Sequence, residues 1–240
     1  METTLHRQLK ELYADPHSQE EVQLDDYRID VIRNDVLIEI QLGSLAAIRD
    51  KVQKLLQNHR VIIVKPVIDR KHLIKLSGPN GEVLSRRRSP KRGNVMTLFD
   101  ELVYCTKLFP HPNLCIDVPF LEIEELRFKG QGRRRWRRKN NFQIEDQKLL
   151  KVTSLQRFLT GDDLRKLIRK KMPTNFHTGH LAEAIDEPRE TAQQMAYCFA
   201  RMNICEQVGK EGNTLIYRFK TTRQRKKSST FRKILPSLIL

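Results

Sequence analysis

The chain has 240 residues, of which 39% are hydrophobic, and its 45 Lys and Arg against 29 Asp and Glu give a formal net charge of +16. This length fits one large or two ordinary domains, and no apolar run is long enough to span a membrane. A chain this basic favours nucleic acid as its partner, DNA before RNA, and not a membrane. It shows neither a secretory signal nor a CxxC pair, so the sequence predicts a cytoplasmic, nucleic-acid-associated protein without a disulfide or zinc framework.

The first part of the chain shows the hydrophobic periodicities of a small α/β unit. The expected elements, in order, are a helix at 2–13, strands at 20–24, 27–33 and 36–42, a helix at about 45–58, and a buried strand at 61–67. This is an α-β-β-β-α-β order, and Ser44 is placed to cap the second helix. A hairpin around 77–81, a helix near 95–104 and strands within 115–128 follow as a β-rich basic elaboration of the same domain.

Three polar residues interrupt two of these apolar strands. Alternation places Asp30 on one face of its strand, and Glu39 and Gln41 together on one face of the next. A two-residue turn at 34–35 sets a register in which Asp30 lies directly opposite Glu39. Like charges that face each other destabilise a strand pair, so the pattern indicates a cation between them or one protonated carboxyl. A divalent metal ion is the simplest such cation.

The rest of the chain predicts a basic linker and a second compact unit. The expected divisions are a first domain at 1–128, a linker at 129–150, a compact unit at 151–220 and a basic tail at 221–240 that is expected to be disordered apart from its last apolar residues. The compact unit has helices that start near Thr160, Thr178 and Pro188, and a hairpin formed by 205–208 and 215–219. Three helices followed by a hairpin are the order of a small winged-helix-like α+β domain.

Clustered basic residues and one helix face are the candidate nucleic-acid contacts. Clustering favours a binding surface over general solubility. An aromatic residue inside the longest arginine run is suited to stack on a base or a sugar. The helix from Pro188 turns Gln, Tyr and Arg side chains outward, where they suit a major groove. The predicted contacts are Arg86, Arg87, Arg88, Arg133, Arg134, Arg135, Trp136, Arg137, Arg138, Gln193, Gln194, Tyr197, Arg201 and Lys210.

The α-β-β-β-α-β order, with Asp30 on one strand and Glu39-Ile40-Gln41 on the next, resembles the PD-(D/E)XK nuclease superfamily. The resemblance covers residues 1–69. It implies a restriction-endonuclease-like core that hydrolyses phosphodiester bonds of DNA with Mg²⁺ or Mn²⁺. In that family the two acids, here Asp30 and Glu39, bind the metal together with the carbonyl of the middle residue, here Ile40. The metal activates water and neutralises charge on the scissile phosphate.

The resemblance also implies roles for residues around this pair. Gln41 stands where the family usually has lysine and would orient the water or the phosphate. Lys51, on the following helix, is a candidate to supply the missing positive charge, and Gln53 a candidate to contact phosphate. Glu2, at the start of the first helix, is a candidate third carboxylate, with Glu21 as its substitute.

Other interpretations stay open at this point. Asp30 and Glu39 are also explained as acids on a solvated sheet face, satisfied by Arg28 or Arg33. Gln41 in place of lysine favours a catalytically inactive DNA-binding regulatory protein. The aromatic residue among arginines favours an RNA-binding or RNA-processing protein. Nucleases of this superfamily often act as dimers, so a homodimer is a further expectation.

Overall fold

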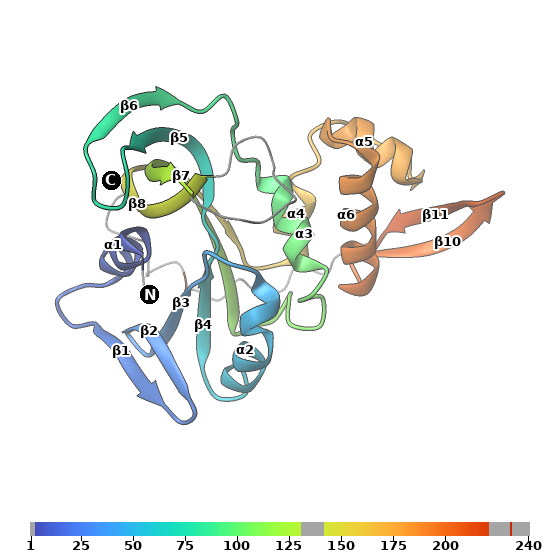
Figure 1. The fold of residues 1–240 in the computed structure, drawn as a ribbon. Helices are drawn as coiled ribbons and strands as arrows, with labels where there is room; N and C mark the ends of the chain where they lie inside the picture. The colour runs from blue at the N-terminus through green and yellow to red at the C-terminus, as the bar shows by residue number, and fades with distance from the viewer. Residues whose placement is uncertain (1–2, 131–141, 221–230, 232–240) are drawn as a thin grey trace.

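The computed structural model describes residues 3–130, 142–220 and 231. The predicted ligand Glu2 and the predicted contacts at 133–138 therefore lie outside the described residues. The chain folds as a mixed α+β protein with one large mixed sheet and one small sheet (Figure 1). None of the described helices is long and apolar enough to cross a membrane.

The helices are α1 (Thr4–Tyr13), α2 (Arg49–Leu55), α3 (Leu98–Leu102), α4 (Gly161–Arg165), α5 (Thr178–Ile185) and α6 (Arg189–Arg201). The strands are β1 (Gln19–Leu24), β2 (Tyr27–Arg33), β3 (Val36–Ile40), β4 (Arg60–Val64), β5 (Val67–Leu76), β6 (Val83–Arg88), β7 (Leu114–Lys129), β8 (Phe142–Phe158), β9 (Asn175–Phe176), β10 (Cys205–Glu211) and β11 (Thr214–Phe219). The predicted α-β-β-β-α-β order is present from α1 to β4. Ser44 accepts a hydrogen bond from Ala46 N–H as predicted, although the turn it caps, Leu45–Ile48, is a 3-10 helix that leads into α2.

The large sheet has the strand order β1-β2-β3-β4-β7-β5-β6, and β8 also pairs with β7. The pairs β3 with β4, β4 with β7 and β5 with β7 are parallel, whereas the other pairs are antiparallel. The predicted hairpin around 77–81 is formed by β5 and β6. The strands expected within 115–128 form the single long strand β7.

Helices cover both faces of the large sheet, so its central strands are buried on both sides (Figure 1). α1 packs over one face, where Leu5 and Leu9 share a cluster with Val36 and Ile38 of β3. The other face is covered by α2, α3 and the C-terminal helices, in a second cluster that includes Leu37. Successive strand residues point to opposite faces, which explains why neighbours in β3 enter different clusters.

β8 corrects the predicted domain boundaries. Residues 142–158 were expected in the basic linker and at the start of the second unit. They instead pair antiparallel with β7, from Phe158 opposite Ile116 to Phe142 opposite Lys129. The linker prediction is therefore wrong from residue 142 onward, and the first domain extends through residue 158. Most side chains of β8 are exposed or half-buried, so the strand has no strong apolar alternation that would reveal it.

The C-terminal unit has the predicted order of three helices and a hairpin. The short strand β9 adds to the hairpin of β10 and β11, which gives a second sheet of order β10-β11-β9. The first of these helices, α4, starts after Thr160 as predicted, where Thr160 and Asp163 form a capping box, and it ends at Arg165. α6 buries an apolar face that includes Met195 and Phe199.

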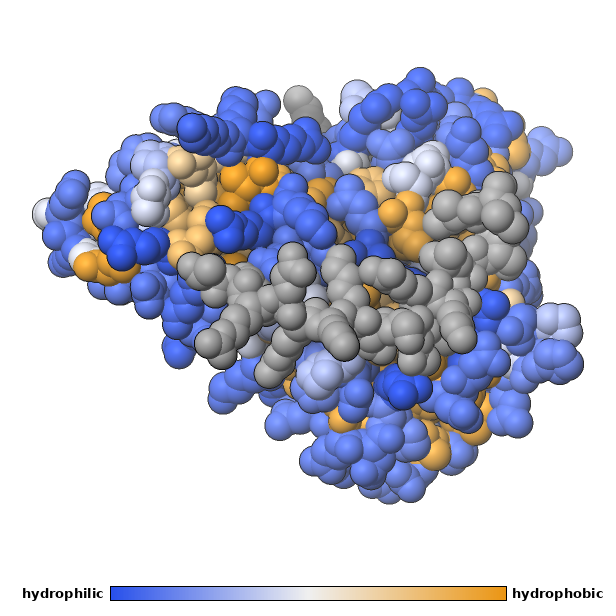
Figure 2. Space-filling view, turned by 180° about the vertical axis from the view of Figure 1, so that it is seen from behind, coloured by the Kyte–Doolittle hydropathy of each residue, from blue (hydrophilic) through white to orange (hydrophobic). Residues whose placement is uncertain are grey.

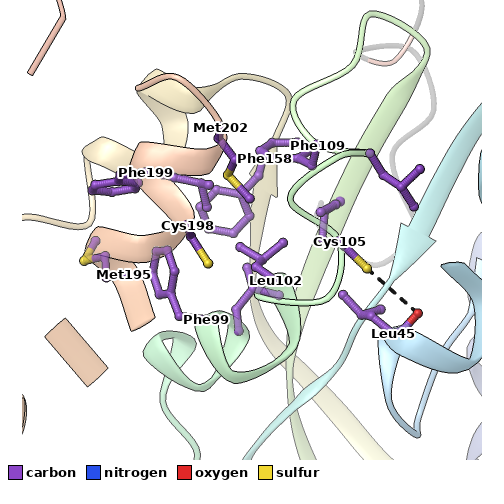
Figure 3. Close-up of a cluster of buried hydrophobic side chains, with 14 of the residues drawn as sticks. Leu45, Phe99, Leu102, Cys105, Phe109, Phe158, Met195, Cys198, Phe199 and Met202 are labelled. Atoms are coloured by element: carbon purple, nitrogen blue, oxygen red, sulfur yellow. Dashed lines mark hydrogen bonds between the residues drawn. The ribbon is translucent and has the colours of Figure 1, made fainter. Parts of the chain in front are cut away.

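The C-terminal unit shares a hydrophobic core with the first domain (Figure 3). Phe99 of α3 meets Phe199 of α6 edge to face, with ring centroids 5.8 Å apart. Leu102, Cys198 and Met202 are buried in the same cluster. The two units are therefore packed against each other, which fixes the position of α6 relative to the large sheet.

One residue of the C-terminal tail packs into the first domain. Phe231 is 1% exposed and belongs to the cluster under α1. Its carbonyl accepts a hydrogen bond from Arg157 of β8. The prediction of a disordered tail is therefore wrong at this position, and the other residues of 221–240 lie outside the described part of the chain.

Candidate active site

Asp30 and Glu39 lie where β2 and β3 part. The last residue pair between these strands is Val31 with Ile38, in the predicted register. Beyond it β2 continues beside β1, and β3 continues beside β4. The ladder thus stops one step short of the predicted pairing of Asp30 with Glu39. Ile29 and Val31 are two residues apart, so regular alternation would put both on the same face of β2. They pack instead in the two different hydrophobic clusters, which shows that β2 twists between them.

Asp30 is held in its ionised form by neighbouring donors. Its side chain is 18% exposed, and Oδ2 accepts a hydrogen bond from Ile40 N–H at 2.7 Å. His6 Nε2 lies 3.6 Å from the same oxygen. Burial raises the pKa of this carboxyl, but the hydrogen bonds from His6 and Ile40 outweigh burial, so the pKa lies below the usual value.

Glu39 has the opposite electrostatic environment. Its side chain is 5% exposed, and Lys51 Nζ of α2 lies 2.6 Å from Oε1. That oxygen accepts no well-aligned hydrogen bond from the described residues, and Lys51 directs a hydrogen bond to the carbonyl of Arg28. Burial raises the pKa of Glu39 to about 7, the charge of Asp30 adds to the rise, and Lys51 opposes it. A buried carboxylate whose neighbours neutralise it incompletely indicates a place for a further cation.

Replacing Glu39 with glutamine is expected to stabilise the protein at alkaline pH. A carboxyl whose pKa rises from 4.5 to about 7 on folding binds more protons in the folded state. The contribution of Glu39 to the free energy of unfolding therefore falls as the pH rises from 4.5 to about 7, and above that pH it is lost completely. Above neutral pH the variant should be more stable than the wild type by about 2–3 kcal/mol. Urea denaturation at about pH 5 and about pH 8 measures the difference.

Asp30→Asn is the matched control, and its expected effect on the free energy of unfolding is opposite to that of Glu39→Gln. The pKa of Asp30 is lowered on folding, so its ionised form stabilises the protein at neutral pH and that contribution is lost as the pH falls. The asparagine variant should therefore be less stable than the wild type at neutral pH. A Glu39→Gln variant that is no more stable at alkaline than at acid pH would contradict the assigned environment of Glu39.

His6 is a site residue that the sequence analysis missed. It lies on α1, and its Nε2 is 3.1 Å from the carbonyl oxygen of Ile40. Because a carbonyl only accepts hydrogen bonds, Nε2 carries the proton and donates it. The sequence offered a signal for this residue, since the helix predicted at 2–13 would put position 6 one turn after the predicted third carboxylate at position 2.

Gln41 follows the Ile40 carbonyl at the end of β3. Its side-chain amide donates to Ser44 O at 2.6 Å. Glu101 of α3 holds the same loop, where it accepts hydrogen bonds from Ser44 Oγ at 2.8 Å and from Leu45 N–H at 2.9 Å. In this arrangement Gln41 supports the loop. Its role toward a water or a phosphate stays a prediction.

Two other candidate residues, the substitute carboxylate Glu21 and the phosphate contact Gln53, have different surroundings. Glu21, the substitute acid, pairs with Lys10 and Arg28. Gln53 is exposed on α2. Of the candidate replacements for the family lysine, Lys51 is the one that the structure brings to the carboxylates.

The site supplies oxygen ligands that suit Mg²⁺ or Mn²⁺. Among the described residues, no three His, Cys, Asp or Glu side chains are grouped to hold a metal ion. The donors present are two carboxylates and the Ile40 carbonyl, and Mg²⁺ is commonly held by one or two carboxylates with water completing its shell. The buried Oε1 of Glu39 accepts no aligned hydrogen bond from the described residues but has Lys51 Nζ at 2.6 Å, so a metal ion bound there would replace the ammonium as its partner. In kind, these oxygen donors fit Mg²⁺ or Mn²⁺.

Arginines on β6 form one of the predicted nucleic-acid surfaces. Arg86, Arg87 and Arg88 are all exposed on this strand, which lies at an edge of the large sheet. Arg86 pairs with Glu124. Arg88 lines a pocket of about 300 Å³ together with two other arginines. On the face seen in Figure 2, most of the side chains that are not grey are hydrophilic, with smaller hydrophobic patches between them.

The outer face of α6 and the β10–β11 hairpin form the other predicted surface. Gln193, Tyr197 and Arg201 are exposed along one side of α6, and Gln194 is half-buried. The guanidinium of Arg201 lies 5.6 Å from the ring centroid of Tyr197. Lys210 is exposed near the hairpin tip. This helix therefore presents polar and aromatic groups that suit nucleic acid.

Comparisons with known proteins agree with the extent of the large sheet. The family "Domain of unknown function (DUF8091)" matches residues 3–159, which run from α1 to the end of β8. An uncharacterized protein of Treponema pallidum (strain Nichols) is 30% identical over 222 residues, which cover 90% of this chain and 85% of that relative. No solved structure matches the chain. Because the family match covers more than half of its residues, the chain belongs to the DUF8091 family.

Proposed function

We propose that this protein is a metal-dependent DNA endonuclease, with a restriction-endonuclease-like core and a winged-helix-like DNA-binding unit. One observation carries the proposal. Glu39, a buried carboxylate, lies with Asp30 and Lys51 at the point where β2 and β3 part. Two acids and a lysine at one place are the groups that metal-assisted phosphodiester hydrolysis uses. The resemblance to PD-(D/E)XK nucleases assigns the same two acids.

Asp30, Glu39 and the Ile40 carbonyl would hold the metal, while His6 keeps that carbonyl oriented through its hydrogen bond. When bound, Mg²⁺ supplies a Lewis acid that lowers the pKa of water and neutralises charge on the phosphate. Asp30 is ionised throughout the neutral range, whereas Glu39 becomes fully ionised only above its pKa of about 7. A proton on Glu39 competes with the metal.

Cleavage at subsaturating Mg²⁺ is therefore expected to rise about tenfold per pH unit below pH 7 and to level off above it. Initial rates of plasmid nicking between about pH 5.5 and about pH 9 measure this profile. Saturating Mg²⁺ should move its midpoint to lower pH, because the metal displaces the proton. A rate that does not change across this range would contradict the role of Glu39.

Lys51→Met is expected to lower the cleavage rate by about 100-fold, because the ammonium group would no longer stabilise charge on the phosphate. The side chain of Lys51 is 15% exposed and lies beside Glu39, so it acts from within the site. Lys54→Met is the matched control on the same helix, since the side chain of Lys54 is 63% exposed. Equal activity of the two variants would remove Lys51 from the proposed mechanism.

A second candidate function is nucleic-acid binding without cleavage. One observation favours it: Lys51 already lies within ion-pair distance of Glu39, so the two acids are partly neutralised without a metal. In that case Asp30, Glu39 and Lys51 would be a structural ion cluster. Metal dependence separates this candidate from the nuclease.

The experiment that tests the proposal incubates the purified protein with supercoiled plasmid, linear duplex and single-stranded RNA, each in Mg²⁺, Mn²⁺ or EDTA. Asp30→Asn and Glu39→Gln keep the shape of each side chain and should lower metal-dependent DNA cleavage by at least about 100-fold. Glu11→Gln is the control, because Glu11 is exposed on the far side of α1. Binding without any cleavage would favour the second candidate, and cleavage of RNA alone would favour RNA processing.

A further inference from the structure

A basic pocket opens in the C-terminal unit beside α4 and the end of β11. Its volume is about 550 Å³. The charged groups that line it are Arg165 of α4, Lys170 and Lys171 of the following loop, and Arg218 of β11. None of its described lining residues is acidic. Four neighbouring cations repel one another, so the pocket attracts an anion.

Two of the four cations are already positioned. Arg218 Nε donates a hydrogen bond to Asn175 Oδ1 of β9 at 2.9 Å. The guanidinium of Arg165 lies over the ring of Phe219, 4.3 Å from its centroid. A guanidinium that is held in place loses little conformational freedom on binding, and its planar fork matches the oxygens of a phosphate. These contacts favour a phosphate over a small halide-like anion.

Apolar side chains, here called the apolar wall, also line the pocket. They are Ile168, Met172 and the part of Phe219 that the Arg165 guanidinium and the stacked Phe176 ring leave uncovered. Inorganic phosphate would use the cations alone, whereas a nucleotide unit would also place its sugar or base against these side chains. The volume lies within the range of pockets that bind ligands of nucleotide size. Cations and apolar wall together indicate a phosphate with an organic group attached.

We propose that this pocket binds a phosphate group of a nucleic-acid strand, with the adjoining sugar or base against the apolar wall. The inference rests on the nucleic-acid binding of the proposed function and not on cleavage. None of the described lining residues lies on α6 or at the tip of the β10–β11 hairpin, so the pocket is a contact separate from both. The C-terminal unit would then hold nucleic acid by two of its surfaces.

The test measures binding of a fluorescent oligonucleotide by anisotropy, in EDTA so that no strand is cut. Lys170→Gln/Lys171→Gln removes two exposed charges of the pocket. The expected result is a rise in Kd of at least about tenfold, with the slope of log Kd against log salt reduced by about 1.8 for a duplex probe or about 1.4 for a single-stranded one. Lys54→Gln/Lys107→Gln removes two exposed charges elsewhere and should change neither quantity. Arg218→Lys keeps the charge but loses the fork, so it should weaken binding at an unchanged slope.

The inference is overturned if the pocket variant binds as the wild type does, or if the control loses as much affinity as the pocket variant. It is also overturned if a mononucleotide at micromolar concentration displaces the oligonucleotide, because the pocket would then serve a free nucleotide. A wild type that binds no oligonucleotide removes the nucleic-acid part of the proposed function as well. A wild type that binds through the pocket but does not cleave leaves this inference intact and removes the nuclease.

Discussion

Phe199→Ala is expected to destabilise the protein by about 3–5 kcal/mol. Phe199 is fully buried, and its ring lies 5.8 Å from the ring centroids of both Phe99 and Phe219. It therefore joins α3 of the first domain to the sheet of the C-terminal unit. Removing it leaves a cavity in the core that both units share (Figure 3). Guanidinium denaturation followed by far-UV circular dichroism measures the loss.

Tyr197→Ala is the control for this experiment. Tyr197 lies two residues earlier on the same helix and is 44% exposed, so its removal should change stability by less than about 0.5 kcal/mol. The shared core also predicts one cooperative unfolding transition for the wild type. Two separate transitions, with Phe199→Ala affecting only the one that belongs to the C-terminal unit, would contradict this packing.

Asp117→Asn is expected to cost about 3–5 kcal/mol, because it leaves the Arg157 guanidinium buried without its carboxylate. The Asp117 side chain is fully buried, and its two oxygens accept hydrogen bonds from Arg157 Nε and Nη2, each at 2.6 Å. Tyr13 of α1 donates to the same carboxylate at 3.1 Å. Burial lowers the pKa of Arg157, but the hydrogen bond and charge of Asp117 outweigh it and raise the pKa above its ordinary value.

Two variants separate the buried pair from charge effects in general. Asp50→Asn breaks the exposed pair of Arg49 and Asp50 and should cost less than about 0.5 kcal/mol. Asp117→Leu/Arg157→Met removes both buried charges and should recover much of the stability that Asp117→Asn loses. If Asp117→Asn is as stable as the wild type, the ion pair with Arg157 does not stabilise the fold.

The turn residues and the apolar alternation in the sequence correctly predicted β2, β3 and the turn between them, which carry the candidate site. Asn34 and Asp35 have φ values of 49° and 61°, as a two-residue hairpin turn requires. The register that follows from this turn pairs Val31 with Ile38 as predicted. Periodicity does not reveal where a strand pair ends, because the separation of β2 from β3 depends on their outer neighbours. The sequence therefore placed Asp30 and Glu39 together, but not the hydrogen bond from Ile40 N–H that replaces their pairing.

Other parts of the fold lay beyond sequence reasoning for identifiable reasons. β8 has apolar residues such as Leu149, Leu150 and Val152, but they do not alternate regularly and bulges shift its register against β7, so the strand gives no clear period-two signal. Its pairing with β7 is also a long-range contact. His6 reaches the site because α1 packs against β2 and β3, which no local pattern encodes. Lys51 was a candidate from its helical position, but its approach to Glu39 depends on how α2 packs on the sheet. Phe231 shows the same limit, since nothing in the local pattern of the tail says that this residue packs under α1.

Titration of the protein with Mn²⁺ at about pH 8, followed by calorimetry, tests the central claim most directly, because it needs no knowledge of the substrate. At that pH Glu39, with its pKa of about 7, is ionised. One Mn²⁺ site is predicted for the wild type and for Glu11→Gln, with affinity at least about 100-fold weaker in Asp30→Asn and Glu39→Gln. Near pH 6 binding should also release a proton, because Glu39 must lose its own to hold the metal. A wild type that binds no Mn²⁺, or that binds it as tightly after both substitutions, would contradict the assignment of Asp30 and Glu39 as a metal site.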